Sequence, residues 1–373
     1  KAGQVDIGTY DHFMQKEIFE QPQAIRDTLE SRITNDSVIT SSFGYKAKEI
    51  FNEVKQIQIV ACGTSYNAGL VAKYWSEDIA KVPCQVEIAS EYRYRRPLLL
   101  NGTLFITLSQ SGETADTVEA LKAAKKINST VKSLCICNSP ESSLTRLSNL
   151  TFLTHAGPEI GVASTKAFST QLVSLALLIC SIGKIQNNID KKQEKEIVDG
   201  LKKLPGLINE TLVQEIQIKE LAKRFIDKNS ALFLGRGTMH AIAMEGALKL
   251  KEISYIHAEA YPAGELKHGP IALIDKNMPV IAIAPNDELL GKLKSNIQEV
   301  KSRGSQMIVF EDENSKVKPM EAMEVIPITS NLGRITAPII FTIPLQLLSY
   351  HVALIKGTNV DKPRNLAKSV TVE

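Results

Sequence analysis

The hydrophobic positions of this chain form short apolar runs, each followed by a turn and then by a segment of helical periodicity. The runs at 56–62, 103–108 and 133–137 predict buried strands, because most of their residues are apolar. Helices are expected after the first two runs, at about 66–80 and up to residue 126. This strand–turn–helix order predicts an α/β fold with parallel strands.

The same order of strand, turn and helix recurs in the second half of the chain. Strands are expected there at 230–234, 280–284 and 306–310. Three landmark pairs connect the halves: Gly63 with Gly235, Glu87 with Glu259, and Ile106 with Ile281. The first two pairs are 172 residues apart (235 − 63 and 259 − 87) and the third is 175 apart (281 − 106). The spacing predicts two copies of one unit, although any two α/β domains share this rhythm by chance.

The expected architecture is therefore two tandem domains, each a parallel sheet flanked by helices in three α/β/α layers. The predicted boundaries are a helical lead-in and linker at 1–45, a first domain at 46–190, a linker at 191–214, a second domain at 215–358 and a tail at 359–373. The first eight residues resemble a linker and the chain lacks an initiator Met, so we expect a fragment of a longer protein.

Composition excludes several classes of protein. Of the 373 residues 43% are apolar, which is typical of globular cores, and the net charge of +3 comes without a basic block, so no nucleic-acid partner is expected. Five cysteines with no second closely spaced pair argue against a zinc site. Reduced thiols in a cytoplasmic protein are expected, because no signal peptide is visible.

One stretch, 335–355, has no Lys, Arg, Asp or Glu over 21 residues and is long enough to cross a membrane. It contains two prolines, a glutamine and a histidine. It is the one membrane-span candidate that we consider in a chain whose composition is otherwise typical of soluble proteins. We expect a buried helix of the α/β core and no membrane.

The most informative turn is Ser109-Gln-Ser-Gly-Glu-Thr114, between the apolar run 103–108 and a helix. A helix N-terminus carries unpaired N–H groups and partial positive charge. Ser109, Ser111 and Thr114 add three hydroxyls, and the turn has no Lys, so it is not a nucleotide P-loop. The pattern predicts a site for a single phosphate monoester; the alternative is that these residues only cap the helix.

The second half carries charged side chains at helical spacing. Glu245, Lys249 and Glu252 stand at i, i+4 and i+7 and so share one helix face. The other positions are mostly apolar, which favours a stripe directed at a cavity and a Glu that acts as a general base. The alternative is a Glu–Lys ladder on the surface.

Two further residues are candidates for chemistry. His268 lies in the glycine-bracketed loop 263–270 and could move a proton, although a lone exposed histidine is usually inert. Lys368 follows Pro363 and Arg364 in a tail whose small and β-branched residues predict a docked segment. A lysine in an apolar, cation-containing site can form a Schiff base with a carbonyl, which suggests capture of the keto form of a sugar phosphate.

Together these residues resemble the sugar isomerase (SIS) fold, and in particular the isomerase (synthase) domains of the glutamine–fructose-6-phosphate aminotransferase (isomerizing) family. The resemblance covers nearly the whole chain. It rests on Cys62-Gly-Thr-Ser-Tyr-Asn67, Ser109-Gln-Ser-Gly-Glu-Thr114, Gly161-Val-Ala-Ser-Thr-Lys-Ala-Phe168, the block 245–270 and Leu366-Ala-Lys-Ser-Val-Thr-Val-Glu373. The block and the terminus are specific to this family, whereas the second motif is shared by SIS proteins generally.

The resemblance implies a role for each matching position. The phosphate of fructose 6-phosphate would be held by Ser109, Gln110, Ser111 and Thr114, with Thr64 and Ser65 nearby. The sugar would contact Val162, Ser164 and Ala367. Lys368 would form the imine at C2, which ammonia would displace, and Glu252 would move a proton between C1 and C2. Lys249 would lie near O1 and O5 with Glu245 as support, and His268 of the partner subunit would help open the ring.

The resemblance also implies partners. The ligands would be fructose 6-phosphate, glucose 6-phosphate or glucosamine 6-phosphate, with no metal or organic cofactor, in a homo-oligomer of at least two chains. The family's N-terminal glutaminase domain, which supplies ammonia, is absent from this sequence. Inhibition by UDP-N-acetylglucosamine is a further expectation, although segment 150–155 gives no clear match to the regulated pattern.

Two other functions stay open at this point. A non-catalytic phosphosugar sensor with two SIS domains would need the turn at 109–114 but not Lys368, Glu252 or His268. A plain phosphosugar isomerase would not need the imine lysine.

Overall fold

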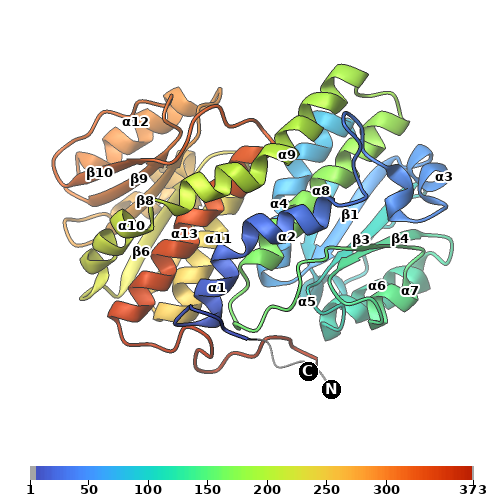
Figure 1. Cartoon of the computed structure of the whole chain (residues 1–373), viewed down its shortest axis with the longest axis horizontal. Coiled ribbons are helices and arrows are strands. Elements are labelled where there is room, and N and C mark those ends of the chain that lie inside the picture. The colour runs from blue at the N-terminus through green and yellow to red at the C-terminus, as the bar shows by residue number, and fades with distance from the viewer. Residues whose placement is uncertain (1–5, 372–373) are drawn as a thin grey trace. The chain divides into compact units, whose positions relative to one another are not determined.

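The computed structural model describes residues 6–371; residues 1–5 of the expected lead-in and 372–373 of the expected tail lie outside the described residues. The chain forms two compact units (Figure 1). The N-terminal unit comprises Gln23–Glu159, Lys166–Lys203 and the tail from Ala367. The C-terminal unit comprises the residues up to Pro22, Ile160–Thr165 and Leu204–Leu366. Each unit is assembled from separate stretches of sequence, and the domain boundaries given above remain predictions.

The N-terminal unit contains a five-stranded parallel sheet in the order β2-β1-β3-β4-β5. Its strands are β1 (Gln56–Ala61), β2 (Cys84–Ile88), β3 (Thr103–Leu108), β4 (Lys132–Cys137) and β5 (Leu150–Leu153). The expected α/β class with parallel strands is therefore confirmed. The edge strand β5 was not expected, because its buried and half-buried residues alternate over only four positions.

Both faces of this sheet are buried, which explains the continuous apolar runs. In β1, Val60 belongs to a buried cluster with Phe105 of β3 and Leu121 of α6 (Ala115–Ile127). Its neighbour Ile59 faces the opposite side, where α4 (Gly63–Trp75) approaches so closely that a Cβ on Gly69 would lie 3.0 Å from Ile59 Cγ2. Successive strand residues thus pack against helices on opposite faces of the sheet.

The C-terminal unit repeats this design with the order β10-β9-β8-β6-β7, also parallel throughout. Its strands are β6 (Ser230–Gly235), β7 (His257–Pro262), β8 (Pro279–Ala284), β9 (Gln306–Glu311) and β10 (Met323–Pro327). The predicted repeat is confirmed by the register: Glu87 of β2 pairs with Val60 of β1, and Glu259 of β7 pairs with Leu232 of β6.

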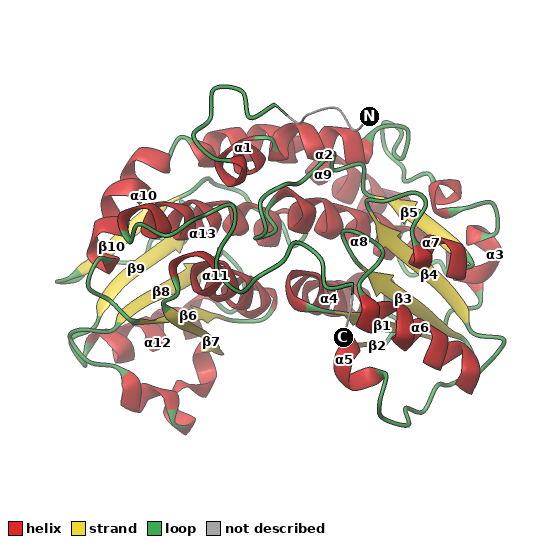
Figure 2. Ribbon diagram, turned by 90° about the horizontal axis from the view of Figure 1, so that it is seen from below, coloured by secondary structure: helices red, strands yellow, loops and turns green. Residues whose placement is uncertain are grey.

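Helices cover both sheets (Figure 2). Besides α4 and α6, the N-terminal unit contains α2 (Gln21–Leu29, from Gln23 on), α3 (Ala47–Asn52), α5 (Ala89–Tyr92), α7 (Ser143–Leu147) and α8 (Lys166–Ile185). The C-terminal unit contains α1 (Phe13–Phe19), α10 (Glu215–Ala222), α11 (Thr238–Ser254), α12 (Leu290–Lys301) and α13 (Thr336–Ile355). The expected linker is largely one helix, α9 (Lys191–Leu212), which contributes to both units.

Two helices are long and apolar enough to cross a membrane, α8 and α13, so the sequence analysis missed one of them. Each has 89% of its most apolar window buried inside the structure. Such burial is typical of core helices, because a lipid-facing helix would leave one side uncovered by protein. The expectation of a buried helix at 335–355 agrees with this structure.

Candidate active site

The N-terminal sheet has a topological switch point between β1 and β3. From β1 the chain runs to β2 on one side and then returns to β3 on the other. In open α/β sheets ligands bind beyond the carboxyl ends of the strands at such a point. The turns that follow these two strands are residues 63–65 and residues 109–114, which we call the first turn and the anion turn. Both were predicted as substrate-binding segments.

The hydroxyls of the anion turn organise its own backbone. Ser109 is buried, its Oγ accepts a hydrogen bond from the Gly112 N–H at 3.0 Å, and it lies 3.0 Å from Thr114 Oγ1. Ser111 Oγ accepts from the Glu113 N–H at 3.1 Å. Thr114 is the N-cap residue of α6 but its side chain makes no capping bond. The interpretation that these hydroxyls only cap the helix therefore fails at Thr114.

The glycine of the anion turn is required by geometry. Gly112 has φ +70°, which side chains rarely adopt, and a Cβ there would lie 2.1 Å from Ser142 Oγ. The close packing of Gly112 against Ser142, which precedes α7, fixes the path of the turn.

The start of α6 offers N–H groups to an anion. Among the described residues the backbone N–H groups of Ser111 and Thr114 have no protein acceptor, and the helix dipole adds partial positive charge. Glu113 does not oppose an anion directly, because its carboxylate accepts from the Ser143 N–H at 2.7 Å. Hydrogen bonds from Ser143 lower the pKa of Glu113, so it stays ionised and engaged with α7.

The first turn leads into helix α4, whose N-terminus lies beside the switch point as that of α6 does. Gly63 has φ +53°, and Thr64 and Ser65 follow it at the N-terminal end of α4. Ser65 Oγ accepts a hydrogen bond from Gln171 Nε2 of α8 at 3.0 Å. Sequence reasoning missed Gln171, because it lies 106 residues away on a helix whose pattern indicates only burial.

The tail was predicted to be a docked segment, and from Ala367 on it belongs to the N-terminal unit. The Val370 carbonyl accepts from the Ala115 N–H, the first of α6, at 3.1 Å. Lys368 Nζ forms an ion pair with Glu159 Oε2 at 2.5 Å, and its side chain is 27% exposed while that of Glu159 is fully buried. Ala367, a predicted sugar contact, precedes this lysine in the same docked segment.

The structure places a carboxylate beside Lys368 that the sequence analysis did not foresee. An apolar, cation-containing site was expected, but the lysine contacts a buried carboxylate, whose other oxygen accepts from the Ala167 N–H at the start of α8 at 3.0 Å. A carboxylate stabilises the ammonium, so it does not by itself activate the amine. Glu159 was missed, because it follows Gly157-Pro158 in a loop with no periodic signal.

The charged stripe of the C-terminal unit is buried in α11. Lys249 Nζ lies 2.6 Å from Glu252 Oε2 and 3.4 Å from Glu245 Oε1. The side chains of Glu245 and Lys249 are 1% exposed and that of Glu252 is 22% exposed. The shared face is confirmed and the alternative of a surface ladder is wrong. Removing one partner from such a buried pair costs about 3–5 kcal/mol, and Glu252 is the member that a ligand can reach.

His268 ends a short 3₁₀ helix, Ala263–His268, and is exposed, with no hydrogen bond or ion pair among the described residues. The loop itself is packed. Arg236, from the turn after β6, lies against Gly264, whose Cβ would be 3.2 Å from the guanidinium, and donates to Asn296 Oδ1 at 3.1 Å. The structure therefore orders the loop but brings His268 to none of the other predicted residues within the C-terminal unit.

The remaining predicted sugar contacts belong to the C-terminal unit. Val162 and Ser164 are half-buried in the segment Ile160–Thr165, and the Val162 N–H donates to the Asp361 carbonyl at 3.0 Å. The predicted set is thus divided: the phosphate residues and Lys368 lie in one unit, and Val162, Ser164, the charged stripe and His268 lie in the other.

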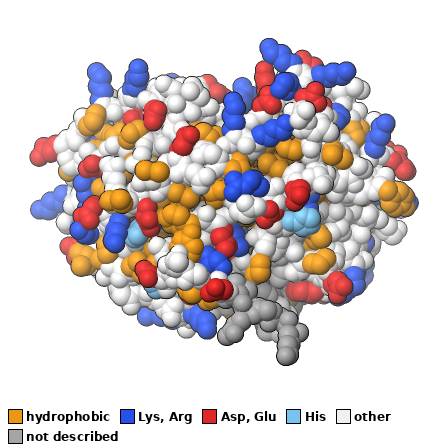
Figure 3. Space-filling view, viewed as in Figure 1, with side chains coloured by type: hydrophobic (Ala, Val, Ile, Leu, Met, Phe, Trp, Pro, Cys, Tyr) orange, Lys and Arg blue, Asp and Glu red, His pale blue; other side chains and the backbone are white. Residues whose placement is uncertain are grey.

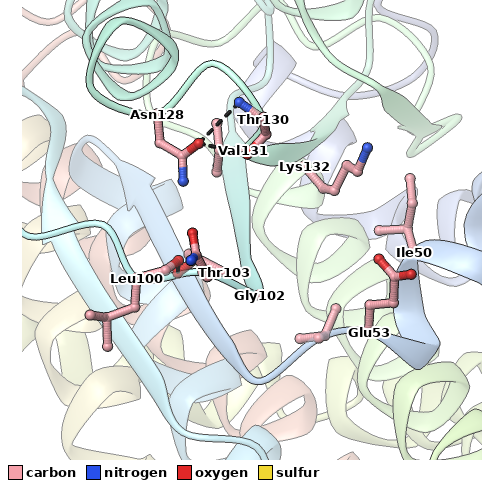
Figure 4. A pocket seen from close by; sticks show the side chains of 11 residues that line it. Ile50, Glu53, Leu100, Gly102, Thr103, Asn128, Thr130, Val131 and Lys132 are labelled. Atoms are coloured by element: carbon pink, nitrogen blue, oxygen red, sulfur yellow. Dashed lines mark hydrogen bonds between the residues drawn. The ribbon is translucent and has the colours of Figure 1, made fainter.

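One surface cavity lies away from both switch points. A pocket of about 420 Å³ lies at the amino ends of β1, β3 and β4, and Figure 4 shows Glu53 and Lys132 at its rim. None of the predicted site residues lines it, and its Asn128 side chain is engaged with Thr130 (Figure 4). Among residues 6–371 no three His, Cys, Asp or Glu side chains are grouped so that they could hold a metal ion. Charges of both signs are interspersed on the face in Figure 3.

Two parallel sheets of identical strand order, one with an anion turn at its switch point, define a duplicated α/β/α domain architecture. The model of the SIS domain matches residues 50–181 and 224–356, so the chain belongs to the SIS domain family. It is 56% identical over 372 residues to the glutamine–fructose-6-phosphate aminotransferase (isomerizing) of Pseudomonas putida, covering 100% of this chain and 61% of that protein. The corresponding protein of Aliivibrio fischeri is 58% identical over 368 residues, covering 99% and 60%.

A solved structure resembles the whole chain. The C-terminal domain of glucosamine-fructose-6-phosphate aminotransferase from Francisella tularensis superposes with a TM-score of 0.93 at 54% identity, covering 95% of this chain and 99% of that one. The chain spans about 60% of the length of the curated relatives named above, and the solved structure that it matches is a C-terminal domain.

Proposed function

We propose that this chain is the isomerase half of a glutamine–fructose-6-phosphate aminotransferase, which converts fructose 6-phosphate and ammonia to glucosamine 6-phosphate. The relatives carry that name, and the anion turn, the tail lysine and the charged stripe supply the side chains that such a reaction needs. The observation that carries the proposal is the docked tail, which holds Lys368 against Glu159 and bonds to the first N–H of the anion-turn helix.

Binding is assigned to the N-terminal switch point. The phosphate would accept hydrogen bonds from the hydroxyls and free N–H groups of the anion turn, with Thr64 and Ser65 at the neighbouring helix start. Each N–H at a helix start contributes charge as well as a hydrogen bond. A phosphomonoester would fit here better than a nucleotide, because the turn has no lysine to span a diphosphate.

Lys368 is the proposed nucleophile. Its ammonium must first lose a proton to water, and Glu159, in contact with it, holds the side chain in place. The free amine attacks C2 of the open-chain ketose, and water leaves as the imine forms. Ammonia then displaces the lysine, so that nitrogen stays on C2 and the amine returns to the protein.

The isomerisation step needs a base that moves a proton from C1 to C2. We assign it to Glu252, the more exposed carboxylate of the charged stripe, with Lys249 and Glu245 holding it in place. For ring opening we propose His268 of the partner subunit, because a residue so exposed in one chain is available to a second copy.

The biological setting belongs to the same proposal. The protein would act in the cytoplasm as an oligomer of at least two chains, on the first step toward UDP-N-acetylglucosamine. Ammonia would come from the glutaminase domain of the full-length protein. Inhibition by UDP-N-acetylglucosamine is tested directly by adding it to the isomerase assay.

The proposed function is tested by trapping the imine. The chain is incubated with fructose 6-phosphate, reduced with borohydride and mapped by mass spectrometry, with the Lys368→Ala variant as the matched control. A hexose-phosphate adduct on Lys368 supports the proposal. No adduct in a protein that still binds the sugar phosphate would favour the plain isomerase or the sensor instead.

A further inference from the structure

A buried glutamine connects the core to the predicted phosphate site. Gln171 lies on α8, is 1% exposed, and its Nε2 donates to Ser65 Oγ at 3.0 Å. Helices α4 and α8 pack side by side in the N-terminal unit (Figure 2), so the bond joins two neighbouring helices. Its Oε1 is buried and has no hydrogen-bond partner in the described part of the chain. Buried amides normally satisfy both ends, so this one is not arranged for stability alone.

Two other polar side chains of α8, Thr170 and Ser174, behave differently. Thr170 Oγ1 donates to the Lys166 carbonyl and Ser174 Oγ donates to the Thr170 carbonyl, both within the helix. These side chains satisfy themselves locally. Gln171 instead extends to the start of another helix and leaves its own oxygen unpaired.

The bond from Gln171 determines what the Ser65 hydroxyl can do. A hydroxyl has one proton to donate and two lone pairs that accept. Because Gln171 donates to Ser65 Oγ, that bond occupies a lone pair and leaves the proton free. Among the described residues no acceptor for this proton lies within hydrogen-bonding distance. Ser65 stands in the first turn of α4 beside the switch point, where an anion would be the acceptor.

We propose that Gln171 is a positioning residue, which orients the Ser65 hydroxyl as a donor to the phosphate of the bound sugar. The inference rests on the proposed function, because it needs a phosphate ester at this switch point. Gln171 itself is not assigned any contact with the reacting atoms. It acts through Ser65, and its effect is therefore on affinity and not on the chemical steps.

The test measures the affinity for fructose 6-phosphate by calorimetry and the yield of the borohydride adduct at saturating sugar. Gln171→Glu offers the Ser65 proton an acceptor inside the protein and should raise the Kd at least tenfold. Gln171→Met removes the donor at similar volume and should raise the Kd about threefold to fivefold. Adduct yield at saturation should not change in either variant. Ser174→Ala, a buried polar change nearby on the same helix, should leave the Kd unchanged.

A double-mutant cycle separates positioning from a general structural effect. In a Ser65→Ala background, Gln171→Met should change the Kd by less than twofold. Full additivity of the two changes, or wild-type affinity in both folded Gln171 variants, overturns the inference. Failure of the wild-type chain to bind fructose 6-phosphate overturns the proposed function instead, so the two failures are distinguishable.

Discussion

The two switch points have the same strand order and opposite chemistry. After β3 the N-terminal unit places the hydroxyl-rich anion turn, whereas after β8 the C-terminal unit places Pro285-Asn-Asp-Glu288. Asp287 Oδ1 accepts from the Leu289 N–H at 2.9 Å, at the start of α12. The chain's own carboxylate thus occupies the place that an external anion would take in the other unit. The sheet creates the position in both copies, and a few turn residues decide whether a ligand can use it.

The two units also differ in which of the predicted binding and catalytic residues they carry. In the sequence the predicted phosphate turn lies in the first copy and the charged stripe and His268 lie in the second, a division that would make one copy bind and the other react. The structure instead docks the tail, with Lys368, on the unit that carries the anion turn. The other unit keeps the charged stripe and His268, together with Val162 and Ser164. The residues predicted for binding and for chemistry are therefore distributed over both units.

The largest effect is expected from Lys368→Ala. If this lysine forms the imine, aminosugar synthesis should fall by at least about a thousandfold. The Kd for fructose 6-phosphate should stay within about threefold, because the phosphate residues are untouched. Product assays with added ammonia, together with calorimetry, measure both. A loss of binding as large as that of Ser111→Ala would contradict the separation of the tail from the anion turn.

Two glycine substitutions compare the anion turn with an ordinary helix position. Gly112→Ala should destabilise the protein by about 2–4 kcal/mol, because its φ is +70° and its Cβ would clash with Ser142. Sugar-phosphate affinity should fall at least about thirtyfold. The control is Gly291→Ala in α12, which has open space around it and should stabilise by about 0.5 kcal/mol. Thermal unfolding and calorimetry compare them; equal effects would refute the special role of the turn.

The ion pair of the tail should matter less than the lysine itself. Glu159→Gln keeps a polar side chain but removes the charge that holds Lys368, so the rate of adduct formation should fall about tenfold. Glu194→Gln is the matched control, because Glu194 forms another carboxylate–lysine pair of this unit, with Lys184 at 2.9 Å. It should lower stability without changing the adduct rate. An unchanged rate in Glu159→Gln would mean that the pair only anchors the tail.

The smallest effect is expected at the C-terminal switch point. Burial raises the pKa of Asp287, so the folded state binds a proton more readily than the unfolded state. Its contribution to stability therefore falls as pH rises from the unfolded pKa through the folded pKa. Asp287→Asn keeps a capping oxygen and removes this dependence. Sugar affinity should stay within twofold and the free energy of unfolding within about 0.5 kcal/mol at neutral pH.

Denaturant unfolding at several pH values tests the sign of this last effect. Relative to wild type, the Asp287→Asn variant should gain stability as pH rises from acid to neutral. The opposite trend would show that the helix N-terminus, and not burial, governs this carboxyl.

The local pattern of apolar and polar residues was sufficient to predict much of the fold. The apolar runs of β1, β3 and β4 predict buried strands, because both faces of a parallel sheet are covered and most strand positions are therefore apolar. The anion turn was recognisable for a similar reason, since its hydroxyls and glycine are consecutive in sequence and lie at a strand-to-helix junction. The short edge strands β5, β7 and β10 were missed, because their patterns are brief and half-exposed.

The sequence by itself determined the duplicated α/β architecture, the anion turn and the shared face of Glu245, Lys249 and Glu252, because each depends on spacing within one segment. Only the tertiary structure decided the burial of that stripe, the pairing of Glu159 with Lys368 across 209 residues and the approach of Gln171 to Ser65 across 106. Such contacts form when helices and tail pack together. No periodicity within a single segment encodes them, so they enter only with the packed core.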